Sequence, residues 1–271
     1  MKGEWQVIDF NSKKGFICDM DGVIYHGNQI LPGVIEFIDW LHREEKDFLF
    51  LTNNSGFTPK ELQQKLQRMG VDVSEEHFYT SALATASFLK EQSPGCSAYV
   101  IGEAGLLNAL YDAGITMNDV NPDYVIVGEG KSYSLDTLTK AVNLVLNGAK
   151  LIGANSDISG PIEHGIAPAC RALVAPIELA TGKQAYFCGK PNPLMMRTGL
   201  NLLGCHSGEA VMIGDRMDTD IISGMECGMS TVLVLSGVSS RESIHTFAYR
   251  PTMIFDGVGD IVKMAEQQKT F

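Results

Sequence analysis

The chain contains 271 residues, which is long enough for one large domain or two moderate ones. Hydrophobic residues make up 45% of the sequence and charged residues 20%, as in an ordinary globular protein. The formal net charge of −11 argues against a nucleic-acid polymer or an anionic membrane surface as the partner. A small phosphorylated ligand is not excluded, because a local cation or metal ion can override the charge of the whole molecule.

Three features of the sequence predict a cytoplasmic protein. No run of about 18 apolar residues is present, so we expect no transmembrane helix. Residues 1–5 lack the basic-then-apolar order of a signal peptide. The six cysteines are scattered and form no Cys-x-x-Cys pair, so we expect buried, reduced thiols.

Apolar runs and helical patterns alternate along most of the chain, which predicts an α/β protein with a parallel sheet covered by helices. Strands are expected at residues 15–18, 48–51, 78–80, 99–101, 124–127, 151–152, 186–188, 211–213, 231–235 and 253–254. Helices are expected near residues 34–41, 58–70, 86–89, 106–110, 134–146, 169–179, 219–228 and 261–265. The Gly- and Pro-rich run 159–168 is expected to be an ordered loop.

The first strand ends abruptly in Asp19-Met20-Asp21-Gly22. Open α/β sheets bind their ligands at the carboxyl ends of parallel strands. Two acids placed there repel each other unless a cation lies between them or one of them stays protonated. The simpler interpretation is a strand followed by an ordinary Asp-Gly turn.

Polar clusters follow four of the expected strands, and neighbouring parallel strands bring their carboxyl ends to one edge of a sheet. The clusters are Asp19 with Asp21, Thr52 with Asn53, Lys190, and Asp215 with Asp220. None of the six histidines has the spacing of a metal ligand, and His26, near the acidic pair, is expected to be a loop residue.

These residue types suit the binding of a phosphoryl group. Asp19 and Asp215 offer the hard oxygen ligands that Mg²⁺ prefers. Lys190 offers a compact positive charge, and Thr52 and Asn53 offer neutral donors. A carboxylate that attacks phosphorus would form an aspartyl phosphate, while a second carboxyl group could protonate the leaving oxygen and later activate water.

Four sequence blocks, in this order, resemble the haloacid dehalogenase superfamily of Mg²⁺-dependent phosphohydrolases. The blocks are Asp19-Met20-Asp21-Gly22, Leu51-Thr52-Asn53-Asn54, Gly189-Lys190-Pro191, and Gly214-Asp215 with Thr219-Asp220. Almost the whole chain is similar to the NagD-type branch of that superfamily. The segments that add to this likeness are residues 79–82, 121–128 and 235–238.

The resemblance implies a role for each matching residue. Asp19 would be the nucleophile and Asp21 the general acid and base, with Gly22 supporting the turn. Mg²⁺ would be held by the carboxylates of Asp19 and Asp215 and by the main-chain carbonyl of Asp21.

The remaining positions would handle the phosphoryl group. Thr52 and Lys190 would bind and neutralise its oxygens, with Asn53 as a further substrate-binding residue. Asp220 would orient Lys190 or the water shell of the metal rather than bind the metal directly.

The resemblance also implies the domain organisation. Residues 1–84 and 185–271 would form a Rossmann-like core with helices on both faces of its parallel sheet. Residues 85–184 would form an inserted α/β cap of type 2, which closes over the substrate.

The implied substrates are nucleoside monophosphates, sugar phosphates and aryl phosphates. Cap residues that could contact the leaving group are Asn155, Asp157, His164 and Arg171. The oligomeric state cannot be read from the sequence, and a homodimer rests on analogy alone.

Three other functions remain as alternatives. A haloacid dehalogenase would share the fold and nucleophile but would need neither Asp21 nor Mg²⁺. A receiver-type phosphoacceptor module would not need a large insertion. A non-catalytic module that binds phosphorylated metabolites would need no complete catalytic set.

Overall fold

The chain folds into two compact units, described in a computed structural model of residues 7–131, 133–162 and 164–270. The first unit comprises Met1–Thr52, Lys65–Phe78 and Met196–Phe271, and the second comprises Asn53–Gln64 and Tyr79–Met195. Residues 1–6, on which the expected absence of a signal peptide depends, lie outside the described residues. The predicted core and cap boundaries, at residues 84/85 and 184/185, stay a prediction.

A six-stranded sheet with the order β15-β14-β13-β1-β4-β5 forms the centre of the core. Its strands are β1 (Gly15–Cys18), β4 (Asp47–Thr52), β5 (Phe78–Thr80), β13 (Ala210–Gly214), β14 (Ser230–Val234) and β15 (Met253–Phe255). The pairings of β1 with β4 and β13, of β13 with β14, and of β14 with β15 are parallel. Every residue of β1 and β13 is buried, as expected for parallel strands that are covered on both faces. A short antiparallel hairpin of β2 (Tyr25–His26) and β3 (Gln29–Ile30) follows β1.

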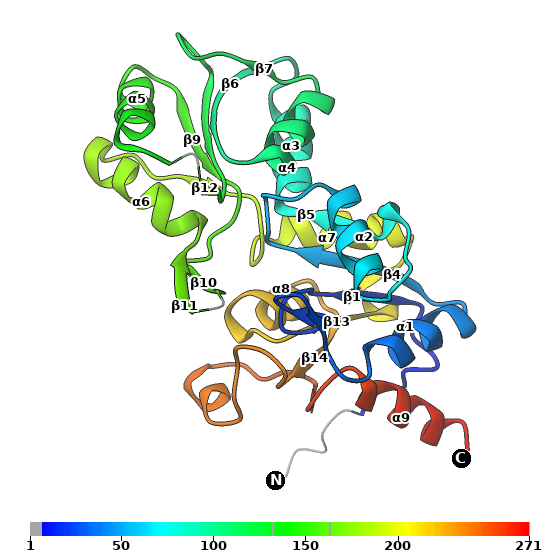
Figure 1. Cartoon of the computed structure of the whole chain (residues 1–271). Helices are drawn as coiled ribbons and strands as arrows, with labels where there is room; N and C mark the ends of the chain where they lie inside the picture. The colour runs from blue at the N-terminus through cyan, green and yellow to red at the C-terminus, as the bar shows by residue number, and fades with distance from the viewer. Residues whose placement is uncertain (1–6, 132, 163, 271) are drawn as a thin grey trace. The chain divides into compact units, whose positions relative to one another are not determined.

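Helices cover both faces of this sheet. On one face, Phe16 of β1 packs against Trp40 of α1 (Val34–Arg43), with ring centroids 5.3 Å apart. Helix α1 also packs against α9 (Gly259–Gln268), and Figure 1 shows the two side by side. On the other face, Gly199 of α7 (Pro193–Leu203) lies against Ile17 and Leu51. The prediction of a Rossmann-like sheet with helices on both faces is therefore confirmed.

The second unit contains a five-stranded parallel sheet with the order β12-β9-β8-β6-β7. Its strands are β6 (Ser97–Ile101), β7 (Thr116–Met117), β8 (Tyr124–Val127), β9 (Lys150–Gly153) and β12 (Tyr186–Phe187). Its helices are α3 (Ser81–Gln92), α4 (Ala104–Asp112), α5 (Leu135–Leu146) and α6 (Cys170–Thr181). Buried side chains of β8, α5 and α6 share one core, and Figure 1 shows α5 and α6 on the opposite side of the strands from α3 and α4.

The structure differs from the predicted elements at three places described here. Residues 159–168 are not a loop but the antiparallel strands β10 (Ser159–Ile162) and β11 (Gly165–Pro168). Helix α7 was not predicted. The helix expected from residue 219 begins as a π-helical turn, Met217–Ile221, and continues as α8 (Ile222–Glu226).

Helix α2 (Pro59–Arg68) begins at a capping box. The Thr58 hydroxyl accepts from the Glu61 N–H at 3.2 Å, and the Glu61 carboxylate accepts from the Thr58 N–H at 2.8 Å. The cysteines are unbridged; four are buried as predicted, whereas Cys205 and Cys227 are partly exposed.

Among the described residues, no helix is both long and apolar enough to cross a bilayer.

The contact between Gly33 and Gly259 lets α1 and α9 approach closely. Gly33 has a φ of 81°, and a β-carbon there would lie 2.7 Å from the Gly259 α-carbon. We expect Gly33→Ala to lower the free energy of unfolding by about 1–3 kcal/mol more than Gly27→Ala. Gly27 is the matched control, because its φ is 59° but no atom lies within 4 Å of a β-carbon added there. Urea denaturation measures both variants, and equal losses would contradict the packing argument.

Candidate functional site

Three of the predicted site residues lie at the carboxyl ends of adjacent parallel strands of the first unit: Asp19 and Asp215 follow β1 and β13, and Thr52 is the last residue of β4. Cys18 of β1 lies opposite Phe50 of β4 and Ile213 of β13. Asp19 is the next residue after Cys18. Thr52 comes two residues after Phe50, and Asp215 comes two residues after Ile213. Because the three strands run parallel, these side chains share the carboxyl edge of the sheet.

Asp19, Asp215 and Asp220 form a buried carboxylate cluster. Each offers an oxygen that lies within 4.8 Å of the oxygens of the other two. Their exposed fractions are 8%, 1% and 0%, respectively. The structure therefore places Asp220, which the resemblance assigned to an orienting role, in the same cluster as the other two acids.

Main-chain groups hold the cluster in place. The N–H of Val238 donates to Asp215 Oδ2 at 2.7 Å, and the N–H of Arg216 donates to Asp220 Oδ2 at 3.1 Å. Glycines provide the space for these carboxylates: a β-carbon at Gly237 would lie 2.0 Å from Asp215 Oδ2. Main-chain groups therefore help to fix the carboxylates of Asp215 and Asp220.

The carboxylate cluster fits a hard divalent cation. Three negative charges held this close together and away from water require compensating positive charge. Carboxylate oxygens are the ligands that Mg²⁺ prefers, with water completing its octahedral shell. The donor set thus suits a metal ion, and the assignment of Asp19 and Asp215 as its ligands stays a prediction.

Asp21 lies outside the carboxylate cluster in a different environment. Its side chain is 54% exposed, and its Oδ1 atom is 3.7 Å from Nδ1 of His26. Although half of the side chain is exposed, desolvation raises the pKa of the Asp21 carboxyl, and the nearby charges of Lys65 and His26 oppose this rise. A carboxyl group with a raised pKa is suited to donate a proton near neutral pH.

Gly22 directly follows Asp21 in the turn after β1. Its φ is 80°, a conformation that costs other residues energy. A β-carbon at this position would also lie 2.6 Å from Asp215 Oδ2. The carbonyl oxygen of Gly22 accepts a hydrogen bond from the Ser236 hydroxyl at 2.7 Å, which ties the turn to the segment after β14.

The second unit brings Asn53 and Lys190 together. The side-chain carbonyl of Asn53 accepts from the N–H of Lys190 at 2.7 Å, and its amide donates to the Lys190 carbonyl at 3.0 Å. The same amide donates to Asp157 Oδ2 at 3.1 Å. Asn53 therefore holds the Lys190 backbone with its side chain, and Lys190 itself is only 2% exposed.

A hydrogen-bond network of Ser55, Glu129 and Asn155 surrounds the same loop and was not predicted. The Ser55 hydroxyl and the Asn155 amide both donate to the Glu129 carboxylate. The Asn155 amide also donates to the Asn53 carbonyl at 2.6 Å. Asn155 is one of the cap residues named from the sequence, whereas Glu129 was missed, although its position just after β8 is a signal that could have identified it.

The four candidate cap residues have different surroundings. Asn155 and Asp157 are engaged with Asn53, as described above. Arg171 forms an ion pair with Glu178, and His164 is exposed.

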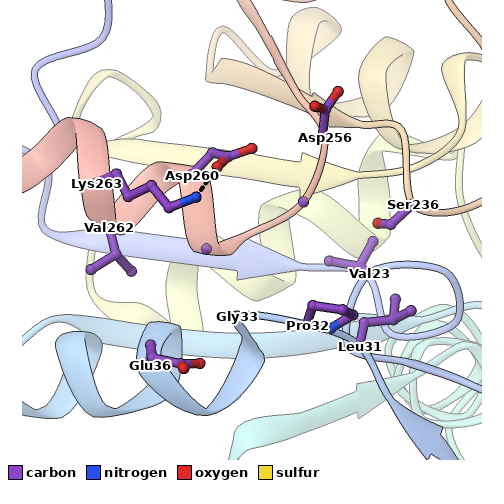
Figure 2. A pocket seen from close by; sticks show the side chains of 12 residues that line it. Val23, Leu31, Pro32, Gly33, Glu36, Ser236, Asp256, Asp260, Val262 and Lys263 are labelled. Carbon is purple, nitrogen blue, oxygen red and sulfur yellow. Dashed lines mark hydrogen bonds and ion pairs between the residues drawn. The ribbon is translucent and has the colours of Figure 1, made fainter.

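A cavity of about 620 Å³ in the first unit does not coincide with these residues. Its lining includes Val23, Leu31 and Ser236 but none of the predicted site residues. Figure 2 shows this cavity between the start of α1 and the start of α9, where Lys263 pairs with Asp260. The cavity is thus not the catalytic site, although Val23 and Ser236 border the turn that carries Asp21.

Two family models match the sequence. A model of haloacid dehalogenase-like hydrolases matches residues 16–116, and a HAD-hydrolase-like model matches residues 187–261. The first range contains Asp19, Asp21 and Thr52, and the second contains Lys190 and Asp215.

Characterised relatives cover nearly the whole chain. A dihydroxyacetone phosphatase of Corynebacterium glutamicum is 46% identical over 91% of this chain and 90% of its own length. The ribonucleotide monophosphatase NagD of Escherichia coli is 45% identical over 92% of this chain and 98% of its own length. The solved structure of a 4-nitrophenylphosphatase from Thermotoga maritima is 32% identical, covers 94% of this chain and 98% of its own, and superposes with a TM-score of 0.90. The chain therefore belongs to the haloacid dehalogenase-like hydrolases, and within them to the NagD-like phosphatases.

Proposed function

We propose that the protein hydrolyses small phosphomonoesters through an aspartyl phosphate on Asp19, with Mg²⁺ as the metal ion. The observation that carries this proposal is the buried cluster of Asp19, Asp215 and Asp220 at the carboxyl edge of a parallel sheet. Mg²⁺ would be held by the carboxylates of Asp19 and Asp215 and the main-chain carbonyl of Asp21, with Asp220 next to them. When bound, Mg²⁺ neutralises negative charge on the carboxylates and on the phosphoryl group.

The reaction has two steps, formation and hydrolysis of the aspartyl phosphate. A carboxylate oxygen of Asp19 attacks phosphorus, the ester P–O bond breaks, and protonated Asp21 gives its proton to the leaving oxygen. Asp21, now a carboxylate, then takes a proton from water as that water attacks the phosphorus of the aspartyl phosphate. The P–O bond to Asp19 breaks, inorganic phosphate forms, and both residues regain their starting states.

Thr52, Asn53 and Lys190 would bind the phosphoryl oxygens. The burial of Lys190 supports this role, because the attraction between an ammonium group and a bound anion is stronger away from bulk water. The hydrogen bonds from the Asn53 side chain to the Lys190 backbone support a positioning contribution from Asn53. Asp220 would support the site by orienting Lys190 or the metal's water shell.

The proposed substrates are nucleoside monophosphates, sugar phosphates and aryl phosphates. The names of three relatives support these substrates: a ribonucleotide monophosphatase, a dihydroxyacetone phosphatase and a 4-nitrophenylphosphatase. Residues 85–184 would form the cap that selects among them and excludes water. A cytoplasmic location, a homodimer and the lack of a nucleic-acid partner stay predictions.

A phosphate-release screen tests the function. We expect phosphate release from 4-nitrophenyl phosphate and from at least one nucleoside monophosphate or sugar phosphate when Mg²⁺ is present, and none after treatment with EDTA. Readdition of Mg²⁺ should restore the activity. A dehalogenase or a non-catalytic binding module would release no phosphate from any of these substrates.

Metal binding can be measured without turnover. Mg²⁺ at about 100 times its Kd should stabilise the folded protein by about 2.7 kcal/mol, seen as a rise in Tm. Asp215→Asn should abolish this rise. The matched control is Asp218→Asn, because Asp218 is half-exposed and pairs with Arg216 at 2.9 Å. An equal rise in both variants would contradict the proposed ligand set.

Asp19→Asn should lower kcat by more than about 10³-fold, because an amide cannot replace the carboxylate nucleophile. The variant should stay folded, since it removes one of three buried like charges. Mass spectrometry of acid-quenched wild type should find phosphate on the peptide that contains Asp19, and the variant should lack it. Asp39→Asn, on the exposed side of α1, is the matched control and should keep full activity. Full turnover by Asp19→Asn would rule out the covalent mechanism.

Asp21→Asn should affect poor leaving groups most. We expect kcat/KM to fall by about 10²- to 10⁴-fold for an alkyl phosphate, because the departing alkoxide needs a proton. The loss should be far smaller for 4-nitrophenyl phosphate, since 4-nitrophenolate leaves without help. Equal losses for the two substrates would count against Asp21 as the general acid.

A further inference from the structure

The side chain of Lys65, on α2, lies over the aromatic ring of Tyr25. Its Nζ atom is 3.6 Å from the ring centroid, which is well within the range of a cation–π interaction. Tyr25 is buried and Lys65 is half-buried, so the pair is largely shielded from water. This contact fastens strand β2 to α2 within the first unit.

Tyr25 is in turn joined to the turn that carries Asp21. Asp21 forms an isolated β-bridge with Tyr25, and the N–H of Gly22 donates to the Tyr25 carbonyl at 2.8 Å. The N–H of Tyr25 donates back to the Met20 carbonyl at 3.3 Å. A shift of Tyr25 would therefore move the backbone on both sides of Asp21.

The charge of Lys65 also acts on Asp21. The Lys65 ammonium lowers the pKa of Asp21, and Asp21 in turn raises the pKa of Lys65 against the effect of burial. Opposite charges on the two groups attract each other. An apolar side chain could pack on Tyr25 without the desolvation cost of an ammonium group, but it would lack this attraction.

We propose that Lys65 is a positioning residue for the phosphatase reaction, which holds Tyr25 and thereby keeps Asp21 directed at the leaving-group oxygen. This inference rests on the proposed role of Asp21 as the general acid. Lys65 itself contacts neither the phosphoryl group nor the metal in this scheme. Its effect should therefore appear only where Asp21 has a proton to deliver.

The test compares Lys65→Met and Lys65→Arg on two substrates. These are 4-nitrophenyl phosphate and the alkyl phosphate that the wild type hydrolyses fastest in the phosphate-release screen. We expect Lys65→Met to lower kcat/KM for the alkyl phosphate by about tenfold and for 4-nitrophenyl phosphate by less than about twofold. Lys65→Arg should restore both values, because a guanidinium group also stacks on an aromatic ring. The ratio kcat/KM is used because it covers only the steps up to departure of the leaving group.

Two further variants separate this role from a general loss of stability. Lys60→Met, at an exposed position of the same helix, should change neither value. Tyr25→Leu should reproduce the pattern of Lys65→Met, and the double variant should be no worse than either single one. Additive losses in the double variant would show that Lys65 does not act through Tyr25 and would overturn the proposal.

Combination with Asp21→Asn separates this inference from the proposed function. In that background, Lys65→Met should have no further effect on the alkyl phosphate. If Asp21→Asn itself affects both substrates equally, the general-acid assignment is wrong. If Asp21→Asn shows the expected selectivity but Lys65→Met affects both substrates equally or neither, only the role of Lys65 is wrong.

Discussion

Three carboxylates held within 4.8 Å of one another, away from water, are the constraint on which the rest of the site depends. Such a cluster opposes folding through both charge repulsion and desolvation. The hydrophobic sheet overcomes this, because the packing that aligns β1 with β13 also brings Asp19 close to Asp215. Main-chain N–H donors from Arg216 and Val238 then satisfy part of the charge, and a bound cation would satisfy more.

Two glycines lie close to the carboxylate of Asp215. A β-carbon would lie 2.6 Å from Asp215 Oδ2 at Gly22 and 2.0 Å from it at Gly237, so both segments approach the carboxylate with bare main chain. A substitution at either glycine would displace the carboxylate before it affected any substrate contact. The short distances of the site are therefore encoded in residues that have no functional groups of their own.

Pattern reasoning recovers the buried parallel strands, because long apolar runs such as residues 48–51 leave little choice of structure. It selects Asp19, Asp215 and Lys190 as candidates, since charged residues close behind such runs are unusual. It misses the Ser55–Glu129–Asn155 network, whose members are up to 100 positions apart in loops without any periodicity.

Two elements are missed for a local reason. Pro193 reads as a chain breaker, yet proline is favoured at the first position of a helix, and α7 begins there. Gly160 and Pro161 likewise suggest a loop, although short two-stranded hairpins tolerate both residue types, and β10 contains them. In both places, whether a glycine or proline is tolerated depends on its position within the helix or strand. Composition alone does not reveal that position.

The two acids of the first turn have the same chemistry but different surroundings. Asp19 is buried in the carboxylate cluster, where a cation would favour its charged, nucleophilic form. Asp21, two residues on, is half-exposed, and desolvation favours its protonated form. Enzymes commonly separate acid from nucleophile by such differences in environment. The backbone of Gly22, directly after Asp21, adopts a left-handed conformation and donates to the carbonyl of Tyr25, the residue whose ring contacts Lys65.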